Sequence, residues 1–204
     1  IAKHTNAFKI NEDVVIPLNR MGEYTDGIEH INIELSIRNK LQLIDGLLSF
    51  FAAGNLPLGK SEDAEGDAIP DAEMLEDRVQ EAIALLDLTH ARWTYLLTRI
   101  DQPLAQAKDV LLALGLEKHA AAIDERLQRQ PDAQLFHLLQ DRTIRVSWKE
   151  EVRAALRHIF NGAAFKLILD ECTAIHQRVL RGRVFVALHM HAGDGNVHTN
   201  IPVN

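Results

Sequence analysis

The residues best suited to chemistry gather near the C-terminal end of the chain, where three histidines flank a short turn. The histidines are His189, His191 and His198. The turn between them consists of Gly193, Asp194, Gly195 and Asn196. Glycine permits backbone angles that a β-carbon would block, and Asp and Asn are typical turn residues. Neutral imidazole nitrogens are good ligands for zinc and related divalent metals, so this segment is a candidate metal site.

The segments around the turn predict two β-strands. Val184–Leu188 is β-rich, and a second such run follows the turn from Val197. Side chains alternate between the two faces of a strand, so His189 and His191 share one face. On the second strand His198 shares a face with Asn200. The turn can therefore let His191 and His198 converge on one point.

Two histidines supply at most half of a tetrahedral site, and a catalytic zinc also needs a third protein ligand and an open position. His189 is interpreted as a residue that does not bind the metal itself but orients one of its ligands. The alternative is a polar hairpin that carries surface histidines. A phosphate-binding loop is excluded because no Gly-Lys-Ser/Thr follows Gly195, and a dinucleotide fingerprint is excluded because a strand follows the turn.

The rest of the chain predicts one N-terminal strand and a long helical region. An apolar run that includes Val14 and Ile16 reads as a strand ended by Pro17. Apolar residues spaced by threes and fours then predict a helix over 21–51. Residues 54–70 are rich in breakers, and 71–180 reads as helical, with Pro103 and Pro131 marking later helix starts. Gly115, Gly162 and Gly182 are expected to interrupt it.

Strands at both ends of a helical block predict an α+β fold: a small antiparallel sheet with a large all-helical insertion. The expected parts are residues 1–53 (opening strand and first long helix), 54–70 (loop), 71–181 (helical insertion) and 182–204 (strand, turn and strand). The chain starts without Met and stops within a predicted strand, so we expect a fragment of a longer protein rather than a complete enzyme.

Composition narrows the function classes. The net charge of −7, with no cluster of Lys and Arg, argues against nucleic acid as a partner. No apolar run reaches the length of a membrane span, and there is no signal peptide. The single cysteine, Cys172, cannot form an internal disulfide and reads as a small buried hydrophobe. We therefore expect a cytoplasmic protein.

The segment from His191 to His198, His-Ala-Gly-Asp-Gly-Asn-Val-His, resembles the H-x-G-D-G-N-x-H signature of the FAD-linked oxidase C-terminal (cap) domain. This domain belongs to D-lactate, glycolate and D-2-hydroxyglutarate dehydrogenases of the vanillyl-alcohol-oxidase superfamily. Residues 9–17 are similar to the strand that opens the domain, which usually ends in D-V-x-V-P. The two segments cover about two dozen residues, in the family's order. The helical block is longer than family members usually carry.

The resemblance implies a fold and a set of roles. The fold would be a truncated, ferredoxin-like cap domain, with the FAD-binding domain before Ile1. His191 and His198 would bind a divalent metal, zinc or a related ion. Asn200 would contact the substrate carboxylate, and Lys9 would be the substrate-binding lysine of the opening strand. The third metal ligand and the catalytic base would belong to a Glu-His pair beyond Asn204.

The activity implied is oxidation of a D-2-hydroxy acid, with hydride transfer to FAD and assistance from the metal. The fragment alone is expected to be inactive and to bind no FAD. The expected partners are the missing FAD-binding domain, a small 2-hydroxy acid, and an electron-acceptor protein or iron–sulfur module. Two alternatives remain open: a helical interaction or electron-carrier docking module with no catalytic role, and a stand-alone metallohydrolase that uses His191 and His198.

Overall fold

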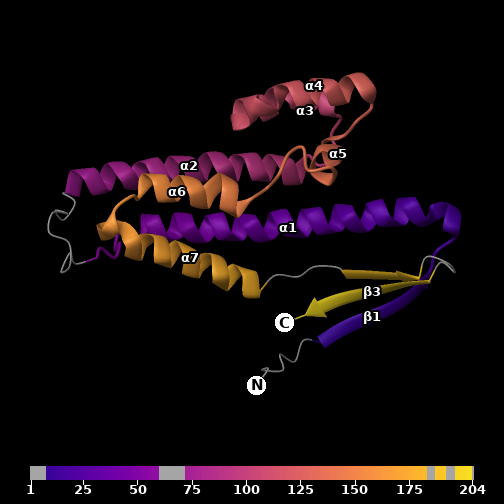
Figure 1. Ribbon diagram of the computed structural model, residues 1–204, viewed down its shortest axis with the longest axis horizontal. Coiled ribbons are helices and arrows are strands. Elements are labelled where there is room, and N and C mark those ends of the chain that lie inside the picture. Colours follow the sequence, from indigo (N-terminus) through magenta and orange to yellow (C-terminus); the bar gives the residue numbers. More distant parts are fainter. Residues whose placement is uncertain (1–7, 60–71, 183–186, 192–195, 204) are drawn as a thin grey trace.

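Two long helices dominate the computed structural model, which describes residues 8–59, 72–182, 187–191 and 196–203. These helices are α1 (Met21–Ala52) and α2 (Ala72–Thr98), and they lie side by side. Figure 1 shows α7 (Lys166–Arg181) along the other side of α1, and α6 (Ala154–Ile159) contacts α2. The bounds of α1 confirm the helix expected over 21–51.

Shorter helices cover one end of this bundle. Helix α3 (Leu104–Leu111) contacts α4 (Ala120–Arg129), and both lie above α2 in Figure 1. Helix α5 (Leu135–Gln140) contacts α1. Five single turns complete the helical elements: η1 (Leu18–Arg20), η2 (Leu112–Leu116), η3 (Glu117–His119), η4 (Trp148–Arg153) and η5 (Ala163–Phe165).

The hydrophobic core lies between the helices. The second half of α1 buries Ile37, Leu43, Ile44, Leu47 and Phe51, at the spacing of one helical face. The facing side of α2 buries apolar residues that include Leu86 and Trp93. At the far end of the bundle the rings of Phe51 and Phe160 stack with their centroids 5.4 Å apart. These contacts join α1, α2 and the segment after α6 into one packed body.

Three strands form a ribbon outside this body. They are β1 (Phe8–Val15), β2 (Ala187–His191) and β3 (Asn196–Val203). Strand β3 is central and pairs antiparallel with both neighbours, so the order is β1-β3-β2. In Figure 1 the strands lie beside the helical bundle rather than within it.

The expected fold class, an α+β domain built on a small ferredoxin-like sheet with a helical insertion, is wrong. The packed fold is all-helical, because α1 shares one core with α2 and α7 instead of covering a sheet. In the described parts of the chain, no strand makes more than a marginal contact with a helix. Three short strands cannot cover the apolar faces of so many helices, so the helices cover one another.

Among the helices that the structure describes, none combines the length and the hydropathy that crossing a membrane requires.

Candidate functional site

Strand pairing brings the histidine positions into one part of the ribbon. In the pairing of β2 with β3, His189 is directly opposite His198, and His191 is opposite Asn196. In the pairing of β1 with β3, Asp13 is opposite His198. Residues directly opposite each other in an antiparallel sheet stand on the same face. Asp13, His198 and His189 therefore occupy one row across the three strands.

The neighbouring rows extend this face. His191 is diagonal to His198, and diagonal positions lie roughly 7–8 Å apart in an antiparallel pair. On the other side of the central row, Asn200 pairs with both Asn11 and Ala187. Lys9, opposite Pro202, takes the next row. The register thus puts the positions expected to bind metal and substrate on one face, in a consistent order along the strands.

The opposite face of the ribbon is mostly apolar by position. Residues of β1 on that face alternate with Asn11 and Asp13 and include Ile10 and Val14. Their partners on β3 are Ile201 and Val197. This period-two alternation is typical of a sheet with one face against apolar surface and one face against water or ligand. A slip of one residue would exchange the two faces, so the pattern fixes the register.

Part of the predicted site lies outside the described residues. Gly193, Asp194 and Gly195 of the turn belong to that part, and Asn196 begins β3. For the strand residues the structure describes backbone pairing only. The roles expected for His191, His198, Asn200, Lys9 and His189 therefore stay predictions, placed on a face by register.

The donor types on this face fit a divalent metal. Imidazole nitrogens and a carboxylate oxygen are the ligands that zinc takes most often apart from cysteine. Three histidine positions and Asp13 supply that set within two adjacent rows. Among the side chains that the structure describes, over 15–59 and 72–182, no group of three or more His, Cys, Asp and Glu residues is placed to hold a metal.

Asp13 shares the row of His198, a position that the sequence analysis did not single out. It lies near the other end of the chain from His198, and spacing along the sequence gives no hint that β1 and β3 are neighbours. The available signal was the alternation within the opening strand. Asn11 and Asp13 are polar positions that alternate with Ile10 and Val14, so they share one face of the strand.

A buried electrostatic cluster of the described side chains lies in the helical body. Arg92 of α2 donates to Glu151 of η4 at 2.9 Å, with only 9% and 17% of the two side chains exposed. The same carboxylate accepts from Trp93 Nε1 at 3.2 Å and from the Ser147 backbone N–H at 2.7 Å. Arg92 also donates to the Leu114 carbonyl at 2.9 Å. With this many partners the pair is a structural link between α2, η2 and η4.

Two histidines of the helical segments have clear local roles. His30 contacts Asp101 at 2.9 Å and so ties α1 to the turn after α2. The backbone N–H of Gln134 donates to His137 Nδ1 at 2.9 Å, which caps α5. Beside Arg92 and Glu151, burial lowers the pKa of His119, and the charge of Lys118 adds to this shift. None of these positions belongs to the histidine face of the ribbon.

Comparison of the chain with family models, with curated proteins and with solved structures finds no match.

Proposed function

We propose that this chain is the substrate-binding part of an FAD-dependent dehydrogenase that oxidises a D-2-hydroxy acid. The observation that carries the proposal is the shared face of the ribbon. The H-x-G-D-G-N-x-H segment and the opening strand, the two segments that resemble the family, come from opposite ends of the chain and pair with each other through β3. Their polar positions coincide on one face, as a common substrate site requires.

The residues on this face have distinct proposed roles. His191 and His198 hold a divalent metal, zinc or a related ion, and His189, opposite His198 on the neighbouring strand, supports a ligand. When bound, the metal supplies a Lewis acid that lowers the pKa of the substrate hydroxyl. Asn200 donates to the substrate carboxylate, and Lys9 offers a positive charge to the same group. Together these side chains orient the substrate so that its C2 hydrogen can face the flavin.

The flavin and the catalytic base are proposed to lie in other segments of a longer protein. FAD would be bound mainly by a separate domain, and the electrons would leave to an acceptor protein or an iron–sulfur module. We place the protein in the cytoplasm, because its single cysteine, Cys172, is free and buried.

The test is direct reduction of the flavin. The longer flavoprotein would be purified with its FAD and mixed anaerobically with a panel of D- and L-2-hydroxy acids. We expect at least one D-2-hydroxy acid to bleach the flavin absorbance at least as fast as the enzyme turns over that acid, while the matching 2-oxo acid does not bleach it. A protein that carries no flavin, or a flavin that no 2-hydroxy acid reduces, would contradict the proposal.

A further inference from the structure

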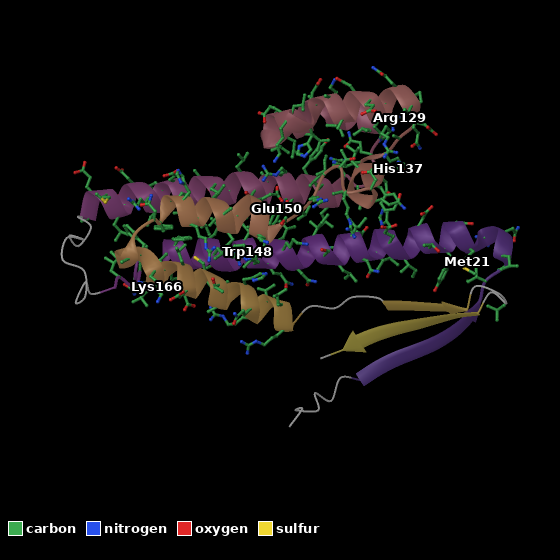
Figure 2. All side chains as sticks on the ribbon, in the orientation of Figure 1. Met21, Arg129, His137, Trp148, Glu150 and Lys166 are labelled. Atoms are coloured by element: carbon green, nitrogen blue, oxygen red, sulfur yellow. The ribbon has the colours of Figure 1, made fainter. Side chains whose placement is uncertain are left out.

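A cavity of about 550 Å³ opens between α1 and the segment that joins α5 to η4. Ile33 and Ile37 of α1 and Ile144 of the segment give it apolar surface. Asn32 and Ser36 add hydrogen-bonding groups along α1. The volume lies within the range of sites for small organic molecules. Figure 2 labels Glu150 at the η4 end of this segment.

Three cations line this cavity: Lys40, Arg142 and Arg145. Lys40 Nζ donates a hydrogen bond to Ser36 Oγ at 2.6 Å. This bond holds the ammonium group of Lys40 along α1. Within the part of the chain that the structure describes, the guanidinium groups of Arg142 and Arg145 have no ion-pair or hydrogen-bond partner, and both residues are exposed. They are therefore free to bind an external group.

The backbone conformation of the segment between α5 and η4 fixes where the side chains of Arg142 and Arg145 begin. The φ angle of Arg142 is 63°, and no other residue apart from glycine has a positive φ in the described chain. The Thr143 backbone N–H donates to Asp141 Oδ1 at 2.8 Å and closes the same turn. The next residue, Ile144, is buried, so it anchors the segment between the two arginines.

The carboxylates of the lining leave a net positive charge. Glu29 accepts from Gln140 Nε2 at 3.0 Å, and Glu150 is the second carboxylate. Glu151, which follows it, belongs to the buried pair with Arg92 and does not line this cavity. Three cations therefore face two carboxylates here, in a chain whose net charge is −7. A local excess of positive charge against that trend favours an anion.

We propose that this cavity binds a small organic anion. Its carboxylate pairs with Arg142 and Arg145, because a guanidinium group matches the planar geometry of a carboxylate. Its apolar part lies on Ile33 and Ile37. The site belongs to the helical body, shares no residue with the histidine face of the ribbon, and does not depend on the proposed dehydrogenase activity.

A second cavity makes the proposal testable at the level of single cations. It measures about 360 Å³, and Arg142 and Arg145 line it too. Lys40 lines only the first cavity, and Lys118 lines only the second. Lys118→Gln is thus a matched control for Lys40→Gln: each removes one lysine charge beside the same two arginines, but in different cavities.

The experiment is a calorimetric titration of the 204-residue chain with sodium octanoate, with 1-octanol as the uncharged comparison. We expect saturable octanoate binding with a Kd of about 1 mM or tighter. The double variant Arg142→Gln/Arg145→Gln should weaken it by about tenfold or more, and Lys40→Gln by about threefold. Lys118→Gln should leave the Kd unchanged. Arg142, Arg145 and Lys118 are exposed, and circular dichroism would check that each variant is folded.

Three results would overturn the proposal. The first is octanoate binding that does not saturate. The second is evidence that charge plays no part in binding. Either 1-octanol would bind as tightly as octanoate, or the double arginine variant would bind octanoate with an unchanged Kd. The third is evidence that the ligand does not occupy this cavity. Either Lys118→Gln would raise the Kd for octanoate as much as Lys40→Gln does, or Lys40→Gln would leave that Kd unchanged.

Discussion

Asp13 stands directly opposite His198 in the pairing of β1 with β3, although the two residues come from opposite ends of the sequence. His189 occupies the position on the other side of His198. A carboxylate beside a metal-binding histidine commonly fixes the orientation of the imidazole and raises its basicity. The pairing therefore gives Asp13 a place in the proposed metal site.

We expect Asp13→Asn to weaken metal binding by about tenfold or more, because it removes the charge next to His198. Zinc titration of the metal-free protein would measure the change. The control is Glu12→Gln, the neighbouring carboxylate, which pairs with Thr199 and belongs to the opposite face. Equal losses in both variants would mean that only net charge matters, and the positional role of Asp13 would be wrong.

The buried pair of Arg92 and Glu151 should dominate the stability of the segment that enters η4. We expect Glu151→Ala to lower the free energy of unfolding by about 3 kcal/mol, since it leaves the Arg92 guanidinium and the Trp93 N–H without their acceptor. Urea denaturation followed by circular dichroism would measure this. Glu150 is the exposed neighbour, and Glu150→Ala should change the free energy of unfolding by no more than about 0.5 kcal/mol.

Gly115 is the glycine whose conformation matters most to the turn η2. Its φ angle is +87°, and an added β-carbon would meet Arg92 Nη1 at 3.1 Å. Gly115→Ala should therefore lower the free energy of unfolding by about 1–2 kcal/mol. Gly27→Ala, inside α1 with nothing within 4 Å of the added carbon, should instead raise it by about 0.5–1 kcal/mol. Similar losses in both variants would show that the turn does not require glycine.

Cys172 should make the stability of the folded protein depend on pH in alkaline solution. Burial, with a smaller effect of the Glu171 charge, raises the pKa of its thiol from 9.0 to about 12. The unfolded chain loses this proton near pH 9 while the folded chain keeps it, so stability is full below pH 9 and falls as the pH rises towards 12.

Urea midpoints measured between pH 8 and pH 11 would test this expectation. Cys172→Ala should be less stable at pH 8, because it leaves a small cavity. Its stability should fall less steeply above pH 9 than that of the parent. Parallel slopes for the two proteins would show that the thiol does not cause the alkaline loss.

Local features of the helical body were predictable from the sequence. The spacing of apolar residues predicts the end of α1 to within one residue. Gly115 and Gly162 interrupt the helical region as expected, and both have positive φ angles. Pro103 directly precedes α3, as expected. Pro131 does not start a helix, because the chain after it first pairs in an extended form with the turn before α3: Gln134 forms a bridge with Pro103, and α5 begins only at Leu135.

The fold class was not predictable in the same way. An amphipathic pattern shows which face of α1 is buried, but it does not show whether a sheet or another helix covers that face. Ile37 and Leu47 fit either case, and the structure packs them in the helical core. The position of Asp13 depends on the pairing of β1 with β3 across the whole chain, which no local pattern encodes. The histidine motif was found because its residues lie close together in the sequence.

The proposed metal role of His198 is tested most directly in the longer protein that we propose to carry FAD, by comparing His198→Ala with His158→Ala. His158 is an exposed histidine of α6, away from the ribbon. Bound metal, flavin content and turnover with D-2-hydroxy acids would be measured on both variants. We expect His198→Ala to lose most of its metal and turnover and to keep its flavin, while His158→Ala keeps all three. Normal turnover and metal content in His198→Ala would show that His198 does not bind a catalytic metal.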